Sequence, residues 1–143
     1  MSTLVIALTA IIAAVAAATA IGVAVNRRSG VLRETDPQTR SASYQDTSDL
    51  GLSRTGPTLL HFSAIWCGPC ASVRRVVERV CAELPDVAHV EIDMDANPVA
   101  AKRLSVLSLP TTFIFDADGR QRYRSAGVPR AADLRTALQP LLA

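Results

Sequence analysis

The strongest pattern in the chain is a run of apolar residues near its amino terminus. Residues 4–25 consist of Ala, Ile, Val, Leu, Thr and one Gly, and no charged side chain occurs among the first 25 residues. Twenty-two such residues are enough for a helix that crosses a bilayer. The alternative is a cleaved secretory signal with Ala18-Thr19-Ala20 as its cleavage site, but the run is long for a signal and no basic segment precedes it. We therefore expect residues 1–25 to be a retained transmembrane anchor.

Residues 26–56 show no comparable regularity. They are rich in Ser and Thr and are interrupted by one proline and three glycines. The apolar residues in this segment are too scattered to predict a core: Val31, Leu32, Tyr44, Leu50 and Leu52. We expect a flexible polar linker over 26–56, with one short ordered turn near residues 48–52.

From residue 57 short apolar runs alternate with amphipathic stretches. Residues 58–63 form an apolar run bounded by turn residues, which is typical of a buried strand. Apolar residues then recur at helical spacing until Pro85 ends the helix: Val73, Val76, Val77, Val80, Cys81 and Leu84. The first half of this region therefore predicts a strand followed by an amphipathic helix.

The second half of the region predicts the remaining elements. Residues 87–93 read as a strand and 98–104 as a short helix. Residues 111–116 and 120–125 predict a hairpin around Asp118-Gly119, and Pro129 begins a last helix that extends to residue 142. The order βαβαββα gives an α/β domain with parallel strands first and an antiparallel hairpin last.

Residues 66–70 read Trp-Cys-Gly-Pro-Cys and carry the clearest chemistry. Two cysteines separated by two residues can close a disulfide, and a helix N-terminus stabilises the Cys67 thiolate, whose free pKa is about 8.5. Cys70, expected one turn inside the helix, is more sheltered and suits the resolving role. A low-pKa nucleophile beside a second thiol is typical of thiol–disulfide exchange.

A zinc site is the alternative for any pair of cysteines at this spacing. Zinc requires four ligands, usually a second cysteine pair or two closely spaced histidines. The chain has one further cysteine, Cys81, and its two histidines, His61 and His89, are 28 residues apart. We therefore expect a redox pair and no metal site, and we interpret Asp93, Asp95, Asp116 and Asp118 as strand ends and turn formers.

Several motifs in order resemble those of the thioredoxin family. The run from Leu59 to Cys70 resembles the family's active site with its leading strand, and residues 90–93 with Asn97-Pro98 resemble the next strand and helix start. Residues 108–111 resemble the loop whose proline, here Pro110, is cis and faces the disulfide. Asp118-Gly119 resembles the final hairpin turn, and Ala126-Gly127 resembles the glycine segment that a substrate chain approaches. The resemblance covers about residues 57–143.

This resemblance implies a thioredoxin-like domain over 57–143, with a mixed sheet flanked by helices and preceded by one transmembrane helix. It also implies that Cys67 attacks a substrate disulfide and that Cys70 resolves the mixed disulfide, with no cofactor besides this redox-active pair. Gly68 and Pro69 resemble the dipeptide of reducing members. The residues expected to contact substrate are Trp66, exposed beside Cys67, with Leu109, Pro110 and Gly127.

The expected partners follow from what the sequence lacks. Without a nucleotide-binding fingerprint, the electrons must come from a reductase or a membrane electron carrier, and the substrate is a disulfide-containing protein. A net charge of +2 gives no argument for nucleic acid. Arg27, Arg28 and Arg33 follow the apolar run, which favours a cytoplasmic domain on a single-pass membrane protein. Tethered relatives of the family on the outer side keep the extracytoplasmic side open.

Two alternatives to a tethered reductase remain. One is an extracytoplasmic disulfide oxidase, isomerase or cytochrome-maturation reductant. The other is a non-catalytic metal-handling or adaptor module, against which the intact residues 66–70 and Pro110 argue.

The two histidines depart from the family pattern. His61 occupies the position of a buried aspartate in the family, and His89 matches a lysine on the adjacent strand. We expect the two side chains to lie within one water of each other beneath the helix of Cys70, with at least one pKa lowered by burial. Two unrelated polar strand residues are the alternative. Cys81 is expected to be a small buried apolar residue, with a regulatory thiol as its alternative.

Overall fold

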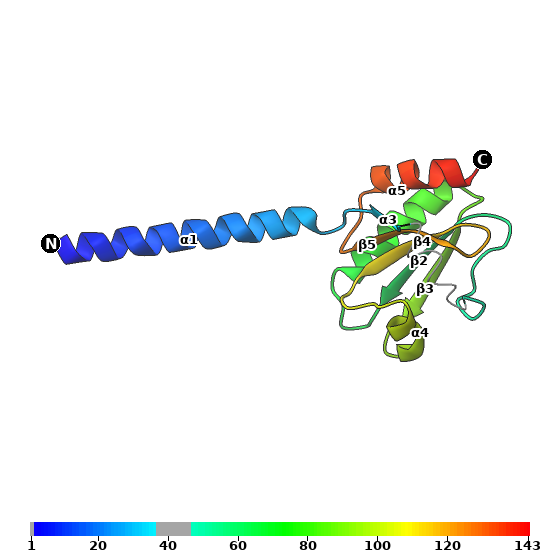
Figure 1. Ribbon diagram of the computed structural model, residues 1–143, viewed down its shortest axis with the longest axis horizontal. Helices are drawn as coiled ribbons and strands as arrows, with labels where there is room; N and C mark the ends of the chain where they lie inside the picture. The colour runs from blue at the N-terminus through cyan, green and yellow to red at the C-terminus, as the bar shows by residue number, and fades with distance from the viewer. Residues whose placement is uncertain (1, 37–46) are drawn as a thin grey trace.

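The computed structural model describes residues 2–36 and 47–143, and its most prominent feature is a long helix outside the domain (Figure 1). Helix α1 (Ser2–Arg28) extends away from the domain and ends in two basic residues, Arg27 and Arg28. None of its apolar window is buried by the rest of the chain. Its length and composition suit a membrane span, as they also suit a signal sequence at this position.

The domain is built on a five-stranded sheet with the strand order β1-β5-β4-β2-β3. Strands β2 (Thr58–Ser63) and β3 (Ala88–Asp93) are parallel, whereas β4 (Thr111–Phe115) is antiparallel to β2 and to β5 (Gln121–Ala126). A two-residue strand, β1 (Arg33–Glu34), pairs antiparallel with β5. The predicted order of elements and the mixed sheet are confirmed, with β1 as an addition.

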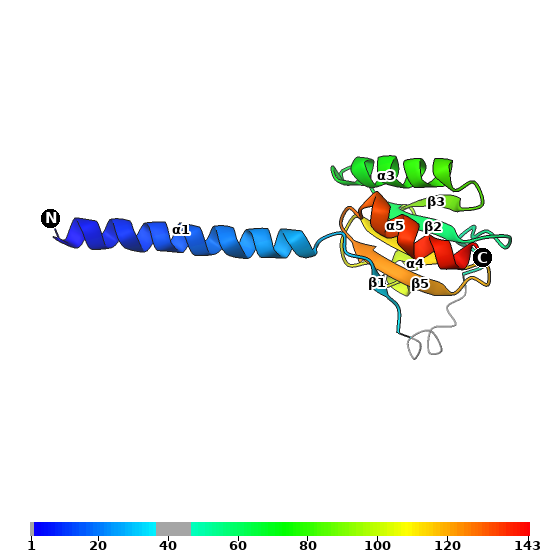
Figure 2. The ribbon, with the colours of Figure 1, turned by 90° about the horizontal axis from the view of Figure 1, so that it is seen from above.

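Helices cover both faces of this sheet. Helices α3 (Cys70–Glu83) and α5 (Ala131–Leu138), the latter continued by a 3-10 turn at Gln139–Leu141, lie on one face, and α4 (Pro98–Arg103) lies on the other (Figures 1 and 2). Because side chains alternate along a strand, Leu59 packs under α3 and α5 while Leu60 packs on the α4 side. Both faces of the central strands are therefore buried.

The segment before β2 contributes to this core, which corrects part of the linker expectation. Leu50 is only 3% exposed and joins the cluster around Phe62 and Phe113. Leu52 packs against the same cluster, and Leu32 packs against the cluster on the other face. Single apolar residues can complete a core that other elements have formed, and such residues need no periodicity. Residues 37–46, with Tyr44, lie outside the described residues.

Candidate redox site

Cys67 and Cys70 form a disulfide at the start of α3. Their Cα atoms are 5.5 Å apart, Cys67 is half-buried, and Cys70 is only 2% exposed. Helix α3 begins at Cys70 with Pro69 as its N-cap, so the expectation that Cys70 lies one turn inside the helix is wrong. Proline lacks an N–H and fits the first turn of a helix, which lets the helix begin this close to the second cysteine. Cys67 therefore lies two residues before the N-cap, and Cys70 is the first helical residue and is buried.

Four loop segments meet at the end of the sheet where β2 ends, and we call this end the redox edge. It comprises residues 64–69, 94–99, 104–110 and 127–130. The strand register shows that these loops share one end of the sheet. Phe62 near the end of β2 pairs with Thr111 at the start of β4, and Thr111 pairs with Ala126 at the end of β5. Pro110 is cis, as predicted, and its carbonyl oxygen accepts a hydrogen bond from the Gly127 N–H at 2.8 Å. Pro110 and Gly127 are thus adjacent to each other on this edge, with the half-buried Leu109 beside them.

Apolar side chains are exposed along the redox edge. Within residues 47–143, the large apolar residues that are exposed all lie there: Ile65 (97%), Trp66 (65%), Val99, Leu107 (91%) and Val128. The Trp66 indole N–H donates a hydrogen bond to Asp95 at 2.8 Å, which holds the ring beside Cys67. The expected exposure of Trp66 is confirmed.

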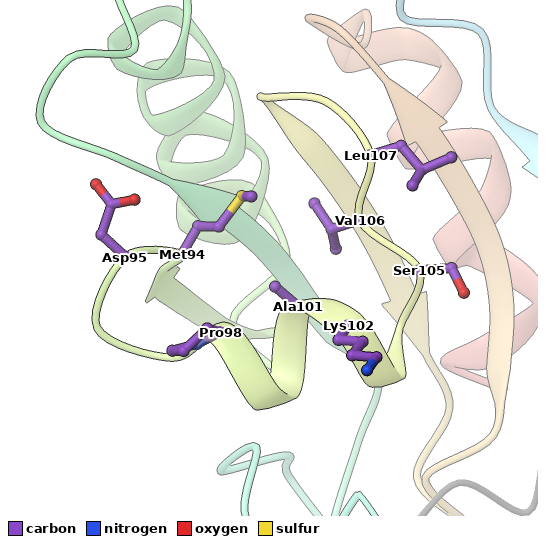
Figure 3. Close-up of a pocket in the computed structure, with 8 residues that line it drawn as sticks. All are labelled: Met94, Asp95, Pro98, Ala101, Lys102, Ser105, Val106 and Leu107. Carbon is purple, nitrogen blue, oxygen red and sulfur yellow. The ribbon is translucent and has the colours of Figure 1, made fainter.

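A hollow of about 520 Å³ on the redox edge is lined in part by Asp95, which accepts the Trp66 hydrogen bond. Figure 3 shows Met94 and Val106 pointing toward one another across it, with Asp95 at one end and the α4 residues below. Its lining is mostly apolar, so it can accept an apolar side chain at the redox edge.

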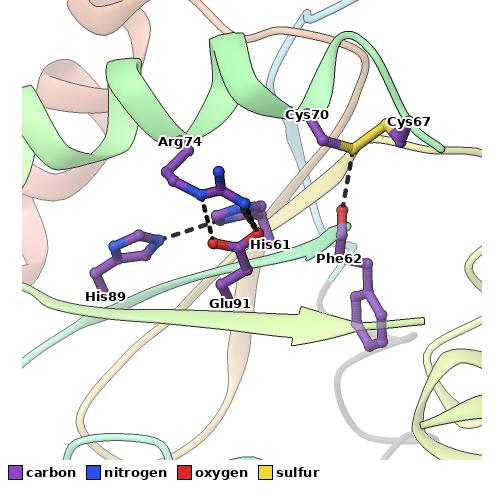
Figure 4. A network of polar contacts seen from close by, with 7 residues as sticks. All are labelled: His61, Phe62, Cys67, Cys70, Arg74, His89 and Glu91. Carbon is purple, nitrogen blue, oxygen red and sulfur yellow. Dashed lines mark hydrogen bonds and ion pairs between the residues drawn. A yellow bond between two sulfur atoms is a disulfide. The ribbon is translucent and has the colours of Figure 1, made fainter. Parts of the chain in front are cut away.

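The two histidines lie together beneath α3, as expected. His61 on β2 is fully buried, and its Nδ1 is 3.2 Å from Nε2 of His89 on β3 (Figure 4). The two rings stack with centroids 5.1 Å apart. The register pairs His61 with Glu91, which places His89 and Glu91 on the same face of β3, the face toward α3.

Arg74 joins this cluster from α3, one turn after Cys70. Its guanidinium donates two hydrogen bonds to the Glu91 carboxylate, from Nε at 2.8 Å and from the second nitrogen at 2.5 Å. These bonds hold the pKa of Glu91 down at about 2, so the carboxylate stays ionised. Glu91 in turn approaches His61 Nε2 to 3.6 Å.

Burial dominates the titration of both histidines. It lowers the pKa of His61 to about 4, although the nearby Glu91 carboxylate acts in the opposite direction. Burial also lowers the pKa of His89. The expectation of neutral imidazoles at pH 7 is confirmed, and the approach of Glu91 to His61 is therefore a contact with a neutral ring rather than an ion pair.

Three polar residues of this site were not predicted from the sequence: Arg74, Glu91 and Asp95. Arg74 follows Cys70 by four residues and so lies on the same helix face, and Glu91 follows His89 by two residues and so lies on the same strand face. These spacings are signals that could have identified both residues. The contact of Asp95 with Trp66 joins loops 29 residues apart and has no local signal.

The remaining candidate residues have simpler roles. Cys81 is half-buried against the core under α3, and burial raises the pKa of its thiol. Asp93 accepts hydrogen bonds from the N–H groups of Asp95 and Ala96, and Asp116 accepts them from Asp118 and Arg120, so both form turns as expected. Gly68 is exposed in the turn between the cysteines.

Comparisons with known proteins agree with this geometry. A family model described as Thioredoxin matches residues 41–140. The chain is 42% identical over 74 residues to a thioredoxin of Chlamydia trachomatis serovar D, covering 52% of this chain and 72% of that protein. It is 42% identical over 91 residues to a thioredoxin of Mycolicibacterium smegmatis, covering 62% and 79%. Among solved structures, a mutant thioredoxin from Halobacterium salinarum superposes with a TM-score of 0.57 at 34% identity, covering 64% of this chain and 79% of the other.

Proposed function

Because the chain belongs to the thioredoxin family and is a thiol–disulfide oxidoreductase, we propose that it is a membrane-tethered reductant of protein disulfides. The observation that carries the proposal is the asymmetry of the redox pair. Cys67 is partly exposed just before the N-terminus of α3, whereas Cys70, the first residue of that helix, is buried. This arrangement suits an attacking thiol followed by a resolving thiol.

The proposed reaction is a two-step exchange. The Cys67 thiolate attacks one sulfur of the substrate disulfide, forming a mixed disulfide and releasing the other substrate sulfur as a thiolate. The Cys70 thiolate then attacks the Cys67 sulfur and displaces the second substrate sulfur. Two electrons move to the substrate, which leaves as a dithiol, and the Cys67–Cys70 disulfide remains.

The second step needs a base for the Cys70 thiol, and we assign this role to His61 acting through water. His61 and Cys70 lie on the same side of β2, and Arg74 connects the turn after Cys70 to Glu91 and His61 (Figure 4). A neutral imidazole can accept a proton, and the Glu91 carboxylate stabilises the imidazolium that results. His89 fixes the ring through its contact with His61 Nδ1.

Substrate recognition is assigned to the redox edge. Trp66 and Leu109 supply apolar contact beside Cys67, and Pro110 borders the path of an extended substrate segment, which can pair with neighbouring backbone as an added strand. Gly127, also expected to contact substrate, instead packs against Ser29 and Gly30. No cofactor besides the redox pair is proposed, so an electron-donating reductase or membrane carrier must reduce the disulfide again.

The proposed tether is α1, retained in the membrane. Arg27 and Arg28 at its end, with Arg33 beyond, support a cytoplasmic domain. Fusions of alkaline phosphatase and of a fluorescent protein after Ala143 test this side. Fluorescence without phosphatase activity is expected, and the reverse result would move the domain outside and favour an extracytoplasmic oxidase, isomerase or cytochrome-maturation reductant.

Reduction of insulin with dithiothreitol tests the catalytic proposal. The full chain in detergent is expected to accelerate insulin reduction, and Cys67→Ser is expected to remove the acceleration. Cys81→Ser is the matched control, because it also removes one thiol but should retain activity. Wild-type protein that is no faster than Cys67→Ser would reject catalysis and favour a non-catalytic adaptor.

A further inference from the structure

The end of α1 is docked on the redox edge rather than joined to the domain by a loose linker. The Gly30 N–H donates to the Ala126 carbonyl at 2.6 Å. A Cβ atom at Gly30 would lie 2.0 Å from the Val128 carbonyl oxygen, and one at Gly127 would lie 3.1 Å from Cβ of Ser29. Backbone therefore packs directly on backbone within two residues of the last helical residue, Arg28.

The strand register shows which end of the domain receives the anchor. β1 runs antiparallel to β5, with Arg33 opposite Arg124, and β5 ends at Ala126 on the redox edge. The chain therefore enters the domain at the redox edge and runs away from it along β1. Figures 1 and 2 show α1 extending from that side of the domain.

The redox pair lies close to this entry point. β1 and β2 are separated by β5 and β4, which is three strand spacings or about 14 Å. Ser29 and Gly30 add at most about 7 Å between the helix and the sheet. A bilayer crossed by α1 would therefore have its surface within about 20 Å of the redox edge.

The exposed apolar residues of the domain face the same way. Ile65, Trp66 and Leu107 belong to loops on the redox edge, as does the hollow beside Asp95. A lipid occupant is disfavoured because Asp95 contacts Trp66 directly, and burial of a carboxylate in hydrocarbon is costly. A protein segment with both apolar and polar groups fits this edge better.

We propose that the substrate is an integral membrane protein whose disulfide lies within about 20 Å of the bilayer surface and whose juxtamembrane segment docks on the redox edge. This inference rests on the proposed function, because it needs both the tether and the exchange reaction. It adds a geometric restriction: the anchor orients the redox pair toward the membrane, and disulfides far from the bilayer are poor substrates.

Full-length protein in liposomes tests the restriction. The probes are disulfide peptides attached to lipid headgroups through Gly/Ser spacers of about 10 or about 45 residues, with r.m.s. reaches of about 17 Å and about 37 Å. Wild type should reduce the short-spacer peptide at least about 10-fold faster than the long-spacer peptide, because its disulfide is concentrated at the docked edge. A short-spacer peptide reduced no faster than the long-spacer one overturns the proposal.

A released domain is the matched comparison. Insertion of a Gly/Ser segment of about 20 residues between Arg28 and Ser29 should reduce the spacer preference to within about 3-fold. Both proteins should reduce insulin equally in detergent micelles. Failure of both on insulin would reject the proposed function, whereas equal activity on insulin with no spacer preference in wild type rejects only the membrane-proximal substrate.

The fluorescence of Trp66 tests the alternative that lipid covers the redox edge, since Trp66 is the only tryptophan in the chain. In liposomes without peptide, brominated lipids are expected to leave its fluorescence within about 10% of that in ordinary lipids, because the edge is free for a protein partner. Strong quenching would show that the edge rests in lipid and would overturn docking of a protein segment.

Discussion

The redox edge and the cluster beneath α3 invert the usual distribution of side chains. At the edge, Ile65, Trp66 and Leu107 are exposed to solvent, whereas beneath the helix His61 is fully buried with polar neighbours. Exposed apolar groups and buried titratable groups each cost stability, and proteins tolerate them mainly where function requires them. Cys67 belongs to the first region and Cys70 to the second.

The contrast assigns different tasks to the two regions. The apolar edge offers contact area for a protein substrate, and the polar cluster offers a group able to take a proton. A single turn of helix separates them, because Arg74 of the cluster lies four residues after Cys70. Variants that affect one region and spare the other therefore test the division.

Exchange of each cysteine for serine should have the largest effect. Cys67→Ser removes the nucleophile and should lower insulin reduction by about 10³-fold or more. Cys70→Ser retains the first attack and should accumulate a mixed disulfide, which intact-mass measurement detects. Accumulation of the adduct in Cys67→Ser instead would reverse the two roles.

His61→Ala should slow the resolving step by at most about 10²-fold, because a base whose pKa is about 4 accepts a proton less readily than one tuned to neutral pH. Because the pKa of His61 is about 4, wild-type resolution should depend on this group only as pH falls toward 4, when the base becomes protonated. The variant should lose that dependence. Rapid-quench release of a labelled thiol measures the step, with Cys81→Ser as the control, and an unchanged pH profile in His61→Ala contradicts the assignment.

Stability should fall between pH 6.5 and pH 4. In this range the unfolded chain protonates His61 at its ordinary pKa of about 6.5, whereas the folded chain resists protonation until about pH 4. The stability is thus fully present above pH 6.5, and about 3 kcal/mol is lost by pH 4. Urea unfolding across this range measures it, and His61→Gln should reduce the dependence to the part contributed by His89, whose pKa is also lowered by burial. An equally steep decline in His61→Gln would place the effect elsewhere.

Trp66→Ala should have the smallest effect of the four. Loss of an exposed aromatic contact should lower kcat/KM for insulin about 5-fold, while reduction of a small aromatic disulfide stays within about twofold. Trp66→Phe should recover most of the loss, because apolar area and not the Asp95 hydrogen bond would be responsible. Equal losses on both substrates would mean that Trp66 acts on Cys67 itself.

Much of the fold was predictable because local patterns determined it. The apolar run at 58–63 predicted a strand buried on both faces, and the helical spacing from Val73 to Leu84 predicted a helix buried along one face; the structure shows both. The redox pair and the cis Pro110 were expected from motifs in order. The contact between His61 and His89 was expected because their strands are adjacent.

Features that depend on distant contacts were not predictable in the same way. Leu50 enters the core from a segment without periodicity, and Gly30 donates a hydrogen bond to Ala126, almost a hundred residues away. The helix start at Cys70 also differed, since helix ends are determined by hydrogen bonds that apolar spacing does not reveal.

The two-residue strand β1 also protects the domain from self-association. An exposed strand edge is a template for pairing with another chain, and short, charged edge strands resist such pairing. β1 pairs with β5 and consists of two charged residues, Arg33 and Glu34. A truncated protein beginning at Gly56 would expose the edge of β5 and lose Leu50 from the core. Solubility at high concentration would therefore depend on residues that lie between the membrane anchor and β2.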